Sequence, residues 1–350
     1  MAKNSNRSSQ NSNSKAKSST TSAKPASVAK AAAPAPEKAK SLSPNRSYWV
    51  KLGKDINRQK GIYLLLIIPM VVYFIFKYIP MWNAQIAFRD FKSVRYGITQ
   101  ATWVGLKNFK DFISSYYFWS IIRNTLFYSF GKIIVSLPVS ILLAIAIYEC
   151  RVRWLRKTVQ TLAYLPHFLS WVIMYGILLS LFSPSDGIVN DVIKMCGGKA
   201  IDFLTNSSAF PWLVILSDAW KEMGWSAIIF IAALMGIDTS LFEAAMVEGA
   251  NSWQRTRYIT LPSIRPVIVT VLLLKIGTIL DAGFNQIFML YSPAVYDVAD
   301  IIDTWVYRQG LLDGKFSIAT AAGIFKGVIG MALLFTSNYF SKKVSESSLF

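Results

Sequence analysis

Long apolar segments separated by short polar ones dominate the sequence from about residue 60 to residue 340. Each apolar segment has roughly twenty or more residues, the length that an α-helix needs to cross the ~30 Å hydrocarbon core of a bilayer. Six such spans are predicted, at about 62–82, 121–149, 158–182, 210–236, 263–291 and 318–340. We therefore expect an all-α integral membrane protein, whose internal prolines are tolerated because neighbouring helices satisfy the freed backbone groups.

The composition agrees with this interpretation. Hydrophobic residues make up 53% of the chain and charged residues only 16%, whereas a soluble domain carries about 25% charged residues. A soluble globular protein is therefore excluded as a class. Cys150 and Cys196 fall on opposite sides of the membrane in the six-span topology, so they are expected to form neither a disulfide nor a metal site.

The positive charge of the chain gathers in its first 60 residues, which hold 13 of the 37 Lys and Arg residues but two of the 19 acidic ones. This segment is rich in Ser, Asn, Ala and Lys, and such a segment cannot bury enough apolar surface to fold. We expect a disordered cytoplasmic tail over 1–58 and a transmembrane domain over 59–345. No aromatic residue precedes Tyr48, which disfavours nucleic-acid binding.

Basic residues in the polar connections orient the spans, because cytoplasmic loops carry the excess of Lys and Arg. The 150–157 connection, the 237–262 loop and the C-terminus share a side with the tail when the number of spans is even. Both termini are therefore expected in the cytoplasm. The opposite loop at about 83–120 is also basic, but it is longer and contains Asp90 and Asp111, so the other loops outweigh it.

The polar loop between the fourth and fifth spans is patterned as a pair of short helices rather than as a slack linker. Ser240 followed by Glu243 fits a capping box, and Gly249 suits a left-handed helix end. Ser252 can cap a second short helix, and Pro262 stops it. A helix-turn-helix of this kind on the basic side of a membrane protein indicates a docking element, although Glu243 alone is explained equally well as a helix cap.

This loop, over residues 238–262, resembles the EAA motif of permease subunits in binding-protein-dependent ABC importers. The motif reads Glu-Ala-Ala, three residues, Gly, nine residues, Ile-x-Leu-Pro, and the matching residues are Glu243, Ala244, Ala245, Gly249, Ile259, Leu261 and Pro262. Many sugar-importing members have Asp-Gly-Ala around the glycine, and Glu248 keeps the charge of that aspartate. Further stretches look like the carbohydrate-uptake class, in its polysaccharide or oligosaccharide permease subgroup: Trp103–Phe109, Gly187–Asn190, Asp281–Leu290 and Tyr291–Leu311.

The resemblance covers nearly all of the chain after the tail, and it implies a type I importer fold of six helices with a cytoplasmic coupling helix. It also implies a transport subunit for oligosaccharides or polysaccharides in the bacterial cytoplasmic membrane, without catalysis of its own. The implied partners are a second, homologous permease subunit, two ATPase subunits and an extracellular or periplasmic substrate-binding protein. In that family the EAA helices contact the ATPases, and the positions implied for this coupling are Glu243, Ala244, Ala245, Glu248, Gly249, Arg255, Leu261 and Pro262.

The sequence gives no sign that this chain binds ATP. No G-x-x-x-x-G-K-[ST] phosphate loop occurs, and the Gly131-Lys132 pair lies inside a span without the rest of that motif. An active transporter built on this chain would therefore need separate subunits that bind ATP and Mg, and no cofactor is expected in the chain itself.

Polar and ionisable residues within the fourth and fifth spans are candidates for the translocation path. Ionisable groups at membrane depth are costly and usually face protein or a water-filled cavity, and sugars bind to aromatic faces and hydrogen-bonding side chains. The candidates are Trp220, Glu222, Trp225, Asp281, Asn285 and Gln286. Alternatively, Asp218 pairs with Lys221 three residues away, and the tryptophans pack in the core or face lipid. His167 is expected to be packed and hydrogen-bonded, because no acidic residue lies within one helical turn of it.

Small residues recur at four-residue spacing in the sixth span, at Ala319, Gly323 and Gly327. Such a face lets another helix approach closely. Packing within the chain and an interface with another subunit are equally compatible with it.

Two other classes of function compete with the importer. A secondary transporter or channel that works without ATPase subunits would be expected to show inverted repeats of interrupted helices, and the two halves show no convincing repeat. A membrane-embedded glycosyl-transfer enzyme would be expected to carry acidic metal-binding clusters in polar loops. Asp297, Asp300 and Asp303 recur every three residues, but in an apolar context and without a D-x-D pair. The basic outer loop and Arg308 fit an acidic sugar and the acidic face of a binding protein equally well.

Overall fold

The computed structural model describes residues 58–92 and 97–345. The tail predicted over residues 1–58 therefore lies outside the described residues except for Arg58. The chain divides into two units, Met1–Pro69 and Met70–Phe350, which are considered separately. The described part of the first unit is the beginning of helix α2 (Lys60–Tyr73), whose apolar side chains are exposed.

Helical structure continues from α2 through the π-helical η1 (Phe74–Tyr78), α3 (Ile79–Met81) and the 3₁₀ segment η2 (Trp82–Phe88). The whole run, Lys60–Phe88, is long and apolar enough to cross a membrane, and none of its apolar window is buried. A large exposed apolar surface of this kind is suited to lipid or to another subunit.

Two long helices, α5 (Phe118–Glu149) and α9 (Phe210–Met235), pack along each other at the centre of the second unit. One core cluster joins them to α12 (Leu261–Gly277), and a second joins them to α13 (Phe284–Leu290). A third cluster, around Phe112 and Trp305, contacts α16 (Phe316–Ser345). Buried side chains therefore line one side of each helix, while the other side remains apolar and exposed, as expected for spans that also face lipid.

The remaining elements are short. They are β1 (Arg89–Asp90), η3 (Ile98–Gln100), β2 (Thr102–Trp103), α4 (Lys107–Ile113), α6 (Arg153–Tyr164), η4 (Leu165–Phe168), α7 (Trp171–Phe182), α8 (Ile188–Met195), α10 (Thr239–Val247), α11 (Ser252–Arg255), η5 (Thr256–Thr260), η6 (Pro293–Val295), α14 (Tyr296–Ala299), α15 (Ile302–Tyr307) and η7 (Arg308–Leu312). The two strands pair antiparallel, with Arg89 opposite Trp103 and Asp90 opposite Thr102.

The described helices agree with the predicted membrane-spanning class. Within residues 58–92 and 97–345, four helices are long and apolar enough to span a membrane, and the count reaches six if two bent helix pairs are each one span. The third predicted span, 158–182, is one of these pairs, because α6–η4 and α7 meet at 110°. Pro166 lies in η4, where the missing proline N–H weakens the helix, and the Ser170 hydroxyl caps α7 by accepting the Ile173 N–H.

The continuous fifth span predicted over 263–291 is wrong. Helix α12 ends at Gly277, and α13 begins only at Phe284, after Gly283 with a φ of +90°. The amino group of Lys132 in α5 donates to the Ala282 carbonyl at 2.9 Å and so satisfies a backbone group in the break. Non-helical backbone at membrane depth is tolerated where protein groups satisfy it in this way, and this long-range contact is not visible in the apolar pattern.

Candidate functional site

The loop between α9 and α12 contains two short helices, α10 and α11, as predicted for residues 238–262. The prediction that Pro262 stops the second helix is wrong, because helical structure runs from α11 through η5 into α12 as Ser252–Gly277. Pro262 is in the first turn of α12, where a missing N–H costs no helical hydrogen bond.

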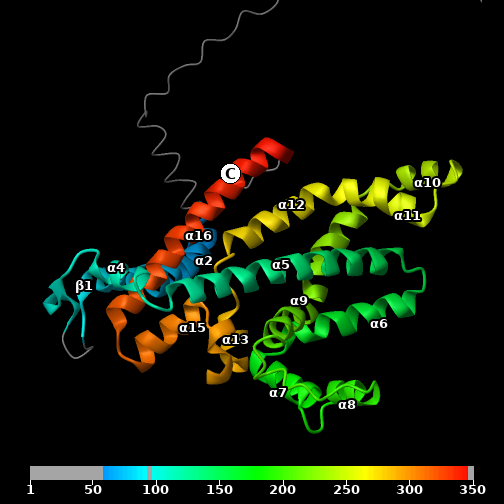
Figure 1. The fold of residues 1–350 in the computed structure, drawn as a ribbon. Coiled ribbons are helices and arrows are strands. Elements are labelled where there is room, and N and C mark those ends of the chain that lie inside the picture. The colour runs from blue at the N-terminus through cyan, green and yellow to red at the C-terminus, as the bar shows by residue number, and fades with distance from the viewer. Residues whose placement is uncertain (1–57, 93–96, 346–350) are drawn as a thin grey trace, which may run out of the picture. The chain divides into compact units, whose positions relative to one another are not determined.

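Helix α10 leaves the direction of α9 by 72°. Figure 1 shows both short helices together at the end of the second unit that lies away from α4 and β1. The Thr256 hydroxyl donates to Glu149 Oε1 at 2.9 Å, which ties this loop to the C-terminal end of α5. The loop is therefore attached to α5 as well as to α9 and α12.

The caps of the two short helices differ from the predicted ones. Asp238, rather than Ser240, caps α10, because its carboxylate accepts the Ser240 N–H at 2.9 Å. This hydrogen bond lowers the pKa of the Asp238 carboxyl below its usual value, since it stabilises the charged form. A reciprocal pair caps α11, in which Asn251 accepts the Gln254 N–H at 2.9 Å and Gln254 accepts the Asn251 N–H at 2.8 Å. Ser252 is the first residue of α11.

Gly249 follows the end of α10 in the left-handed conformation, as predicted, with a φ of +81°. Its N–H donates to the Met246 carbonyl at 3.1 Å, and the Ala250 N–H donates to the Ala245 carbonyl at 2.9 Å. The last carbonyls of α10 are thereby satisfied. A Cβ at position 249 would meet no described atom within 4 Å. Backbone conformation alone therefore demands glycine within the chain, and the space beside it is open to a partner.

The predicted coupling residues divide into an exposed group and a packed group. The exposed ones are Glu243, Ala244, Glu248, Gly249 and Pro262. Ala245 and Leu261 are half-buried. Arg255 folds back on the turn, where it donates to Ser252 Oγ at 3.1 Å and to the Ala250 carbonyl at 3.5 Å. Arg255 therefore holds the turn between α10 and α11 instead of projecting from it.

Three large apolar side chains of this loop were missed by the sequence analysis. Val247, Trp253 and Tyr258 are 89%, 74% and 75% exposed. Exposed apolar side chains gathered on a polar loop mark an interaction site. Their signal in the sequence was the presence of a tryptophan and a tyrosine in the polar segment between two apolar ones.

A polar cavity of about 210 Å³ lies between α5, α9 and the end of α12. It brings together two of the predicted path residues, Glu222 and Asp281. The other ionisable and serine side chains that line it are Ser129, Lys132, Ser136, Asp218 and Lys275. Ser129, Lys132 and Ser136 stand three and four residues apart, so they share one face of α5. That spacing was the available signal, and it was obscured by the long apolar run around it.

An ion pair borders this cavity and joins three elements. Lys132 lies 3.1 Å from Asp218 of α9, and it also donates to Gln286 of α13. The Gln286 side chain is fully buried and donates to the Val214 carbonyl at 2.7 Å and to Ser217 Oγ at 2.9 Å. Gln286 therefore fixes α13 against α9 and is not exposed to a path in this structure. The alternative pairing of Asp218 with Lys221 is not found among the described contacts.

Beside the cavity, His167 is packed and hydrogen-bonded, as predicted. Its Nδ1 lies 2.8 Å from Glu222 Oε2, and its ring stacks on Trp225 with centroids 4.5 Å apart. Lys221 donates to the His167 carbonyl at 2.6 Å and lies 3.4 Å from Glu222. The acidic partner of His167 comes from another helix, which the search within one helical turn could not find.

The other predicted path residues lie apart from the polar cavity. Trp220 lines an apolar cavity of about 480 Å³ between α7 and α9. Trp225 is 46% exposed beyond its stack with His167, and Asn285 is exposed. The six candidates thus form several environments and not a single lining.

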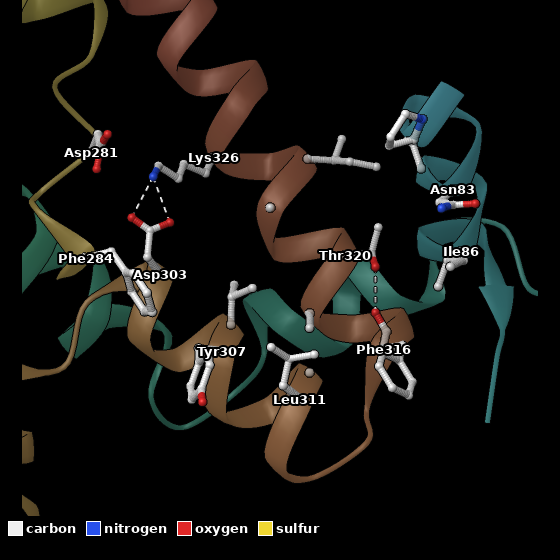
Figure 2. Close-up of a pocket in the computed structure, with 17 residues that line it drawn as sticks. Asn83, Ile86, Asp281, Phe284, Asp303, Tyr307, Leu311, Phe316, Thr320 and Lys326 are labelled. Atoms are coloured by element: carbon white, nitrogen blue, oxygen red, sulfur yellow. Dashed lines mark hydrogen bonds and ion pairs between the residues drawn. The ribbon is translucent and has the colours of Figure 1, made fainter. Parts of the chain in front are cut away.

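A larger groove of about 820 Å³ is formed by η2, the 281–284 segment, α15–η7 and α16. Figure 2 shows Lys326 joined to Asp303 across it, at 2.7 Å, with Asp281 nearby. Burial raises the pKa of the Asp303 carboxyl, and the hydrogen bond and charge of Lys326 oppose that rise. Asp281 borders this groove and also the polar cavity, so the two spaces meet at that residue.

The small residues predicted to form a close-packing face of the sixth span have different surroundings. Ala319 is buried beside Gly310. A Cβ at Gly323 or Gly327 would meet no described atom within 4 Å. Among the described residues, nothing therefore packs closely against α16 at Gly323 and Gly327.

Comparisons with known proteins agree with one another. The model of the binding-protein-dependent transport system inner membrane component family matches residues 136–346. Protein LplB of Bacillus subtilis (strain 168) is 39% identical over 84% of this chain and 92% of its own. The polygalacturonan/rhamnogalacturonan transport system permease protein YteP of the same strain is 40% identical over 84% of this chain and 91% of its own. A chain in the crystal structure of a bacterial ABC transporter involved in the import of the acidic polysaccharide alginate has 38% identity and a TM-score of 0.77, over 84% of this chain and 99% of that one.

Proposed function

Because this chain belongs to the family of binding-protein-dependent transport system inner membrane components, and is a permease of the sugar and polysaccharide ABC type, we propose that it forms half of the translocation path of an ATP-driven importer of acidic oligosaccharides. It has the type I ABC permease fold and is embedded in the membrane. In the proposed assembly both termini lie in the cytoplasm of a bacterial cell, as the basic loops indicate.

The observation that carries the coupling role is the exposure of three apolar side chains in the segment between α9 and α12. Val247 ends α10, Trp253 lies in α11 and Tyr258 lies in the following η5. Both short helices are capped at their starts, and Arg255 holds the turn between them. A rigid, preorganised pair of helices with unburied aromatic residues is suited to insertion into a cleft of a partner. The proposed partner is an ATPase subunit, which would bind ATP and Mg outside this chain.

The proposed acidic substrate rests on the relatives and on the outer loop. YteP is named for polygalacturonan and rhamnogalacturonan, and the structural neighbour for alginate, an acidic polysaccharide. In this chain Lys107 and Lys110 of α4 are exposed at the end away from α10 and α11. A positive surface at the entrance attracts anionic ligands and slows their escape.

The other proposed partners are a homologous permease and an extracellular or periplasmic binding protein.

The test is reconstitution of the full complex in liposomes with its ATPases, second permease and binding protein. We expect ATP-dependent uptake of a labelled oligouronate pentasaccharide that exceeds uptake of a neutral maltopentaose at least tenfold. The competing class, a secondary transporter or channel, predicts uptake by this chain alone under an ion gradient. Uptake of the oligosaccharide by liposomes that contain this chain without any ATPase subunit would contradict the proposal.

A further inference from the structure

Four exposed cations stand close together where the long helix α5 turns into α6. They are Arg151, Arg153, Arg156 and Lys157. In the part of the chain that the structure describes, none of the four belongs to an ion pair, and the first turn of α6 contains no acidic residue. The nearest acidic residue in the sequence, Glu149, accepts a hydrogen bond from Thr256. The 151–157 segment therefore carries positive charge that the described residues do not neutralise.

Large apolar side chains occupy the neighbouring side of α6. Trp154, Leu155 and Leu162 fall within one arc of about 100° around the helix, and Trp154 and Leu162 are 74% and 63% exposed. A third side packs on α9, because Ala163 is buried and its carbonyl oxygen lies only 2.0 Å from the position of a Cβ on Gly224. Helix α6 thus packs on the protein along one side and exposes a basic side and an apolar side next to each other.

The cations lie at the end of a helix that is long and apolar enough to cross a membrane. Helix α5 ends at Glu149, two residues before Arg151. Figure 1 shows the turn from α5 to α6 at the same end of the second unit as α10 and α11, the end that the basic loops assign to the cytoplasm. Tryptophan and leucine on one side of a helix and Lys or Arg on the next are typical of a helix at the boundary between headgroups and acyl chains.

We propose that the 151–157 segment, together with Leu162, is a binding surface for anionic phospholipids of the cytoplasmic leaflet. The guanidinium and ammonium groups bind the headgroup phosphate, and Trp154 and Leu162 contact the acyl chain. An acidic protein would match the charges alone, whereas a phospholipid matches both sides of the helix. Leu162 lies about 12 Å further along α6 than Trp154, toward the membrane interior, where a soluble subunit does not reach. This surface goes beyond the proposed function, because it does not depend on which sugar is transported.

The test compares two photoreactive lipids, phosphatidylglycerol and phosphatidylcholine with the same acyl chains, in nanodiscs that contain the complete complex. Crosslinked peptides that cover residues 150–165 are quantified by mass spectrometry. We expect phosphatidylglycerol to label this stretch at least tenfold more than phosphatidylcholine, and the excess to fall as NaCl is raised, because salt screens exposed charges. The variant R153Q/R156Q/K157Q should lower the phosphatidylglycerol label at least tenfold, since each Lys or Arg near an anionic surface strengthens binding about fivefold.

The matched control is K107Q/K110Q, which removes two exposed cations from α4 at the other end of the second unit. It should leave the label on residues 150–165 within a factor of two. Equal labelling of the wild-type complex by the two lipids would overturn the proposal, and this comparison needs no variant. An R153Q/R156Q/K157Q complex that loses its ATPase while its lipid label is unchanged would assign the basic side to that subunit and would also overturn it.

Discussion

The amino group of Lys132 in α5 lies 3.1 Å from the carboxylate of Asp218 in α9, and both side chains are largely buried. The same amino group donates to the Ala282 carbonyl in the break between α12 and α13. One side chain therefore holds two packed helices and a non-helical segment in a single arrangement. A movement of α5 away from α9, or away from the break between α12 and α13, would have to separate Lys132 from Asp218 or from the Ala282 carbonyl.

Lys132→Met should destabilise the protein by about 3–5 kcal/mol, because it leaves the buried Asp218 carboxylate without its counter-charge. Thermal unfolding of the purified complex measures this loss. The double variant K132M/D218L removes both charges and should recover part of the loss. An unchanged unfolding temperature for K132M alone would contradict a structural role of the pair.

Gly224→Ala should prevent normal packing of α9 on the α6–η4 segment. A Cβ at Gly224 would lie 2.0 Å from the Ala163 carbonyl oxygen, which is a backbone atom and cannot move by itself. Overpacking of this kind costs about 1–3 kcal/mol, and the yield of folded protein together with its unfolding temperature reports it. Gly176→Ala in α7 is the control, since its Cβ would meet no described atom within 4 Å. Equal stability of the two variants would show that α9 packs differently.

Gly249→Trp should abolish ATP-dependent uptake or assembly with the ATPase. The residue has a φ of +81°, so any side chain is strained, and a large one would also fill the open space beside α10. Gly197→Trp separates these two effects, because Gly197 has a φ of +83°, is equally open and follows α8, outside the loop. The strain costs about 1–2 kcal/mol in both variants. Normal uptake by the Gly249 variant would exclude close docking here.

Trp253→Ala should weaken binding of the ATPase while leaving the folding of this chain intact. The side chain is 74% exposed, and loss of a central aromatic anchor typically costs about 2 kcal/mol or more of binding free energy. Co-purification of the ATPase and stimulation of ATP hydrolysis measure the effect. Trp119 is a matched control, because it is 77% exposed and lies at the other end of α5. Equal retention of the ATPase by both variants would place the interface elsewhere.

The two short helices and the left-handed glycine of the 238–262 loop were predicted correctly because their signals are local. The left-handed glycine Gly249 and the two short helices depend on residues within a few positions, and the family motif has a fixed spacing. The details of the caps were less accurate, since Ser240, Asp238, Asn251 and Ser252 can all serve as caps. Which of them does so depends on the exact backbone at each helix start.

The six candidates for the translocation path do not gather around one space in the structure, because contacts between polar side chains in different helices depend on how the helices pack. The amide of Gln286 was selected as a polar group in a span, and the structure buries it against α9. Ser129 and Ser136 were not among the candidates, and serine in an apolar helix normally bonds to its own backbone. Only the folded chain shows that, within its described part, neither of them does so.

The sequence by itself determined that the chain is a helical membrane protein and that a pair of short helices follows the fourth apolar segment. Those properties follow from the hydropathy of each segment and from residues close together in the chain. The tertiary structure alone decided the break after Gly277, the partner of Lys132 and the acid beside His167. These contacts join residues 150 and 55 positions apart, and at membrane depth each polar group must find a partner wherever the packed helices supply one.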